Sequence, residues 1–245
     1  MLTPRVRSIA LVVATLAALA AVLAAYLTRT DDMDWSSRHT APHAVGELDA
    51  GFHAPDVDTF YSSQVVNPDP ESWTKVRPSS TYRVLLLATG KDDHTAYDPQ
   101  VAILAAAVRK WAEAEPQVRL KTRYLSDSTT FIKSIDDAAK HDNADLIITA
   151  GNGLVEPVAV ISANYAGYEP QQFLVLGAEV AEPTTNIAAT DWDGSAYLGE
   201  GLDQAQFYDP EEVTAPRAYA ALRAGVAAVL SGYTSVIVRI PAEEY

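Results

Sequence analysis

The chain has 245 residues, no cysteine and a formal net charge of −14 at pH 7. The lack of cysteine excludes disulfide bonds, a thiol nucleophile, zinc sites with cysteine ligands and lipid attachment at an N-terminal cysteine. The acidic charge disfavours nucleic acid and anionic lipid surfaces as partners, because both are bound mainly through Lys and Arg.

The first predicted element is an apolar helix over 9–27, a stretch without charged residues. A helix of about 20 residues spans the bilayer core of roughly 30 Å. Arg5 and Arg7 precede it and three aspartates follow it within 31–34, so the positive-inside rule places the N-terminus in the cytoplasm. We therefore expect residues 1–30 to be a transmembrane anchor or uncleaved signal in the cell membrane, with the C-terminal domain extracytoplasmic. A cleaved signal peptide is the alternative.

Residues 31–80 are rich in Asp, Pro, Ser and His and have little apolar periodicity. We expect an extracytoplasmic linker that becomes partly ordered near the domain. Its later half contains Val65, Val66 and Trp73 among several prolines. This pattern favours an extended arm that lies on the domain surface.

Residues 81–245 alternate short apolar runs with helical periods, which is typical of βαβ units. The sequence therefore predicts an α/β fold: a three-layer parallel sheet flanked by helices, as a single Rossmann-like lobe. The runs predict strands over 84–88, 118–125, 145–150, 173–176, 186–190 and 236–240.

The predicted helices begin at N-terminal capping signals. Asp98 and Pro99 open the first, Ser126 or Ser128 caps the second, and Thr214 caps the last, which Gly232 ends. A short helix at 195–202 is also expected. Helical spacing predicts four inner faces: Val101, Leu104, Val108 and Trp111; Phe131, Ile132, Ile135 and Ala139; Val158, Ile161 and Tyr165; and Tyr219, Leu222, Val226 and Val229.

The candidate binding residues follow the carboxyl ends of the predicted strands, where parallel α/β sheets bind ligands. Their carboxylates would accept hydrogen bonds from a small polar or cationic ligand, and the two aromatic rings would offer faces for stacking. The alternative is helix capping for the acidic residues and an edge-packed indole for the tryptophan. The residues are Asp92, Asp93, Tyr97, Asp127, Asn152, Glu156, Asp191 and Trp192.

The sequence predicts no catalytic residue, no metal site and no cofactor. It has no phosphate-binding Gly-rich loop, dinucleotide fingerprint, HExxH pair or Gly-x-Ser-x-Gly elbow. Two alternatives to a binding module stay open. One is a metal-assisted extracytoplasmic hydrolase, with a cation held by Asp92, Asp93, Asp191 and Asp193. The other is a structural envelope protein without a small ligand.

Three segments, 144–153, 172–177 and 194–199, together with Tyr97-Asp98-Pro99-Gln100, carry a family resemblance. Over 82–202 the chain resembles the first lobe of the basic membrane protein family of ABC-transporter solute-binding proteins, which have the type I periplasmic-binding fold. The resemblance implies a binding module for a nucleoside-like solute that works with membrane transporter subunits. Because the chain has room for one lobe, a second lobe from another chain is an expected partner.

Overall fold

The computed structural model describes residues 34–38, 40–52, 64–92, 99–195 and 209–241. The chain divides into two compact units, Met1–Ser37 and Arg38–Tyr245. In the first unit the described residues are 34–37, where the Ser36 amide donates to Asp34 Oδ1 at 3.0 Å. Within the described ranges no helix has the length and hydropathy needed to cross a bilayer. The predicted membrane helix over 9–27 lies outside the described residues.

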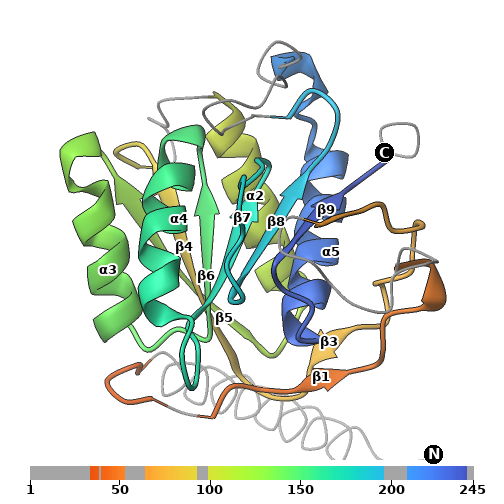
Figure 1. The fold of residues 1–245 in the computed structure, drawn as a ribbon, viewed down its shortest axis with the longest axis horizontal. Helices are drawn as coiled ribbons and strands as arrows, with labels where there is room; N and C mark the ends of the chain where they lie inside the picture. Colours follow the sequence, from red (N-terminus) through yellow and green to blue (C-terminus); the bar gives the residue numbers. More distant parts are fainter. Residues whose placement is uncertain (1–33, 39, 53–63, 93–98, 196–208, 242–245) are drawn as a thin grey trace, which may run out of the picture. The chain divides into compact units, whose positions relative to one another are not determined.

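The second unit is built around a seven-stranded sheet, and all its strand pairs among the described residues are parallel. Helices cover both faces of this sheet (Figure 1). The predicted parallel α/β architecture is therefore confirmed. In spatial order the strands are β2 (Gln64–Val66), β9 (Val236–Arg239), β8 (Ile187–Asp191), β7 (Gln172–Leu176), β6 (Leu146–Ala150), β4 (Tyr82–Thr89) and β5 (Val118–Leu125).

Among the described residues, two helix pairs form the outer layers. Helices α2 (Pro99–Ala114) and α5 (Ala215–Leu230) pack together on one face, and α3 (Phe131–His141) and α4 (Val155–Ser162) on the other. Because both faces are covered, the central strands are apolar throughout, as in β6, where every residue is buried. Short 3-10 helices and a two-stranded antiparallel pair complete the unit: η1 (Ala50–Phe52), η2 (Ser128–Thr130), η3 (Asn152–Leu154), η4 (Ala163–Tyr165), η6 (Pro210–Glu212), β1 (Ala44–Val45) and β3 (Arg77–Pro78).

Among the described residues, the caps and faces of the helices follow the predictions with three corrections. The predicted cap Asp98 and, except for Ser195, the helix expected at 195–202 lie outside the described residues. Tyr165, predicted on the inner face of the helix with Val158 and Ile161, lies beyond α4 in η4 and is half-buried. Thr214 caps α5, its hydroxyl accepting from the Arg217 amide at 3.5 Å. Ahead of α3 the cap is Asp127 rather than a serine, because a turn of 3-10 helix precedes the α-helix. Ile132 was predicted to face inward and is instead 52% exposed. The buried positions of α3 are Phe131, Ile135, Ala138 and Ala139, and Ile132 lies about 100° around the helix from Phe131.

The predicted surface arm contributes a strand to the sheet. Residues Gln64, Val65 and Val66 pair in parallel with β9, and Val66 is fully buried. Further along, Trp73 packs its ring edge against Phe52, with ring centroids 6.5 Å apart. The compact unit that contains this strand begins at Arg38.

Candidate functional site

The carboxyl ends of β4 and β6 mark the point where the strand order reverses, since the chain runs from β4 outward to β5 and then back to β6. Such a switch point is where open α/β sheets bind ligands. Gly151 directly follows β6 with φ of 119°, and a Cβ there would lie 2.5 Å from Thr89 Oγ1. Only glycine therefore allows these two loops to approach each other closely.

The predicted site residues near this switch point are exposed where they are described. Asp92 follows β4, Asn152 begins η3, and Glu156 lies in the first turn of α4. The 3-10 helix η3 contacts β4, so the loops after β4 and β6 are neighbours. Asp93 and Tyr97 lie outside the described residues.

Asp127 caps η2. Its Oδ1 accepts from the Thr129 amide at 3.0 Å and from the Thr129 hydroxyl at 2.7 Å. These hydrogen bonds lower the pKa of the Asp127 carboxyl, because they favour its charged form. The capping interpretation thus accounts for this residue.

Trp192 does not offer a stacking face, contrary to the prediction. Its indole is buried, and Nε1 donates to the Glu212 carbonyl at 2.9 Å. A Cβ at Gly177 would come within 3.3 Å of its ring. A buried indole needs an acceptor for its N–H, and the Glu212 carbonyl is that acceptor. The structure therefore matches the alternative of an edge-packed indole.

A charged cluster lies at the carboxyl ends of β7, β8 and β9. Asp191 and Arg239 are the last residues of β8 and β9 and face each other in register. Arg239 donates to Asp191 Oδ2 through Nε at 3.1 Å and through Nη2 at 2.7 Å. Nη2 also pairs with Glu179. The Asp191 side chain is 3% exposed and that of Arg239 is 26% exposed.

Glu179 reaches this cluster through a sharp turn after β7. Gly177 adopts φ of 77°, and the amides of Gly177 and Ala178 donate to the Thr190 carbonyl at 2.8 and 3.1 Å. The chain therefore bends back beside the end of β8. Sequence analysis missed Glu179 and Arg239, because neither follows a strand in a polar loop motif.

Burial raises the pKa of Asp191 from 3.8 to about 7, and Glu179 adds to the rise while Arg239 opposes it. One guanidinium cannot neutralise two buried carboxylates. Asp193 adds a further negative charge that acts on Arg239. The cluster therefore has an excess of negative charge that a proton or a donating ligand group can offset.

The raised pKa predicts a pH dependence of stability. The unfolded chain loses the Asp191 proton near its ordinary pKa, whereas the folded chain keeps it up to about pH 7. The contribution of this group to the free energy of unfolding is thus complete below pH ~4 and is lost as the pH rises through about 7. In urea unfolding between pH 4.5 and 7.5, we expect wild type to lose stability relative to Asp191→Asn. A constant difference between the two proteins would contradict the pKa assignment.

The described residues contain no group of three or more His, Asp and Glu side chains placed to share a metal ion. Of the four aspartates considered for a cation, Asp93 lies outside the described residues and Asp191 is paired with Arg239.

No protein-family model and no curated protein matches the chain. Twelve chains of solved structures do. An ABC transporter solute-binding protein from Aeropyrum pernix K1 is 21% identical with a TM-score of 0.39, over 46% of this chain and 29% of that one. A putative lipoprotein fragment from Peptoclostridium difficile 630 is 18% identical with a TM-score of 0.41, over 60% and 98%. A solute-binding protein from Mycobacterium smegmatis with bound glycerol is 12% identical with a TM-score of 0.35, over 64% and 55%.

The match spans 29% of the Aeropyrum pernix protein and 36% of a solute-binding protein from Conexibacter woesei DSM 14684. Similarity at TM-scores below 0.5 is too low to assign this chain to the family of any of these proteins.

Proposed function

We propose that this chain is a membrane-anchored, extracytoplasmic binding module without catalytic activity, and that it takes a small polar solute at the carboxyl edge of its sheet. The cluster of Glu179, Asp191 and Arg239 carries this proposal. It brings together Asp191 and Arg239, at the ends of two neighbouring strands, and Glu179, from the turn after a third strand, at the edge where parallel α/β sheets bind ligands. Buried, perturbed charges in such a position are typical of functional sites.

The cluster suits a ligand that can both accept and donate hydrogen bonds. Among the described residues no acceptor pairs with Nη1 of Arg239, whose side chain keeps some exposure. The two carboxylates share a single guanidinium and have acceptor capacity left. Neighbouring hydroxyl groups on a ribose ring match this combination, which favours a nucleoside-like solute.

The resemblance of the sequence to the basic membrane protein family supports the same ligand class, and the predicted apolar helix over 9–27 supports anchoring. An open edge buries little of a small ligand, whereas good sites bury most of it. We therefore propose that a second lobe from another chain, or a transporter subunit, completes the site.

A thermal-shift screen of the full-length protein in detergent tests the proposal, with adenosine, inosine, uridine and ribose as probes. A ligand at 100 times its Kd adds about 2.7 kcal/mol of stability, which corresponds to a rise in Tm of roughly 5–10 °C for a domain of this size. We expect at least one probe to raise the Tm, and Asp191→Asn to reduce the shift.

Asp127→Asn is the matched control, because it changes a capping aspartate at the same edge of the sheet. It should lower the Tm slightly and leave the ligand-induced shift unchanged. If no probe shifts the Tm, or if both variants reduce the shift equally, the carboxyl-edge cluster is not the binding site.

A further inference from the structure

A cavity lies at the edge of the sheet opposite the carboxyl-edge cluster. It has a volume of about 800 Å³ and is lined by residues from 38–41, 139–145 and 164–172. Asp145 and Gln172 stand at the beginning of β6 and β7, so the cavity opens at the amino ends of the strands. Its volume falls within the range of about 300–1,000 Å³ that is typical of small-molecule sites. The carboxyl-edge cluster contributes none of the residues that line it.

Side-chain amides dominate the polar lining of this cavity. Asn143, Asn164, Gln171 and Gln172 all line it, and each amide offers both donors and an acceptor. Oε1 of Gln172 is buried and has no hydrogen-bond partner among the described residues. A buried acceptor left unpaired is costly. The set of amides therefore offers both donors and acceptors to a ligand in the cavity.

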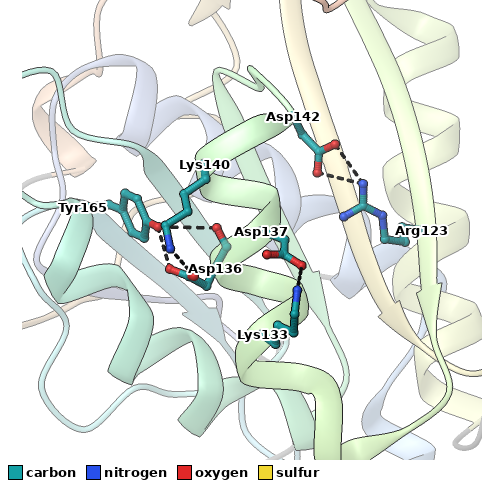
Figure 2. Close-up of polar contacts among 7 residues, drawn as sticks. All are labelled: Arg123, Lys133, Asp136, Asp137, Lys140, Asp142 and Tyr165. Carbon is teal, nitrogen blue, oxygen red and sulfur yellow. Dashed lines mark hydrogen bonds and ion pairs between the residues drawn. The ribbon is translucent and has the colours of Figure 1, made fainter.

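Tyr165 forms an aromatic wall that is held in place. Its hydroxyl donates to Asp136 Oδ1 at 2.6 Å, and Lys140 pairs with the same carboxylate (Figure 2). The hydrogen bond from Lys140, followed by that from Tyr165, lowers the pKa of Asp136. Burial, together with the bond to Asp136, raises the pKa of Tyr165. The phenol therefore stays neutral and its ring stays fixed at neutral pH.

Tyr168 lies three residues further on and is 98% exposed. Gly167 precedes it, and Glu169 follows it with a left-handed φ of 55°, so the loop before β7 presents the ring to solvent at the cavity. A tyrosine ring gives a large, rigid contact surface at low entropic cost. Two tyrosine rings beside a set of amides match a molecule with apolar C–H faces and hydroxyl edges.

Charges of both signs line the cavity. Arg38 is positive, whereas Glu169 and Asp145 are negative, and Asp145 accepts from the Arg83 amide at 2.7 Å. The mixture gives no strong preference for an anion or a cation.

We propose that this amino-edge cavity binds a neutral carbohydrate of one or two rings, independently of the carboxyl-edge cluster.

Saturation-transfer NMR on the full-length protein tests this proposal. The probes are glucose, maltose, cellobiose and chitobiose, and the detergent has no sugar headgroup. We expect transfer to at least one probe with a Kd in the millimolar range or lower. Tyr168→Ala should weaken binding about tenfold, because it removes one stacking face. Val160→Ala, at an exposed position of α4 outside the cavity, should bind as wild type does.

Gln172→Leu should change stability and sugar affinity in different directions. Removal of an unpaired buried acceptor should leave the Tm unchanged or raise it, while the affinity for the sugar should fall at least threefold. Asp191→Asn should leave sugar binding unchanged, which separates this proposal from the carboxyl-edge site. Absence of transfer to all four probes, or wild-type affinity in Tyr168→Ala, would overturn the proposal.

Discussion

Arg239→Met should lower the free energy of unfolding by about 3–5 kcal/mol at pH 7.5, because removal of one partner leaves buried charges without compensation. The substitution keeps the aliphatic part of the side chain but removes the guanidinium, which leaves Glu179 and Asp191 buried beside each other. Urea unfolding of the full-length protein, followed by circular dichroism, measures the loss. At pH 4.5, where the raised pKa keeps Asp191 protonated, the loss should be smaller.

Arg123→Met is the matched control. Arg123 makes an equally short ion pair with Asp142, at 2.8 Å, but both side chains are partly exposed (Figure 2). Exposed pairs contribute about 0–1 kcal/mol, so this variant should be close to wild type. In an Asp191→Asn background, Arg239→Met should cost at least 1 kcal/mol less than it does alone, since coupled groups are not additive. Equal losses for the two arginines would show that the cluster is not effectively buried.

Val66→Ala should cost about 2 kcal/mol, from the lost methyl groups and the space they leave. Val66 is fully buried in β2, although the sequence around it has the composition of a linker. Neighbouring Val65 points to the other face of the strand and is 37% exposed, so Val65→Ala should cost less than about 0.5 kcal/mol. Denaturant unfolding of both variants measures the difference. Indistinguishable losses would mean that 64–66 is a loose arm and no part of the sheet.

Hydrophobic patterning predicted the sheet well, because local sequence determines where a strand begins and ends when both faces are buried. Residues 118–125 form β5 with the predicted bounds, and Thr214 caps α5 as its position before Pro216 indicates. Strand β2 escaped prediction because it has three residues and its pairing partner lies about 170 positions further along the chain. Its position depends on tertiary contacts that no local pattern contains.

The candidate site was predicted only in part, for a related reason. The rule for parallel sheets directed attention to the carboxyl edge, and Asp191 does lie there in a perturbed environment. Arg239, which pairs with Asp191, lies 48 residues from it in the sequence. Glu179, which pairs with the same arginine, lies 60 residues from Arg239. Pairings at such separations depend on the strand order, which the sequence pattern left open. The same rule gave no reason to search the amino edge, where Tyr165 and Gln172 line the cavity.

The pairing of β2 with β9 also constrains when the fold can be completed. During synthesis residues 64–66 emerge long before 236–238, so the first strand of the sheet in the chain cannot pair until the last has been made. Closure of so long a loop carries a large entropic cost and is slow compared with local helix and strand formation. Until residues 64–66 attach, the Val-Ile-Val edge of β9 has no neighbour on the side that faces β2. An open apolar edge attracts strands from other chains. Attachment of this short strand is therefore the step at which a nascent copy either completes its own sheet or aggregates with another.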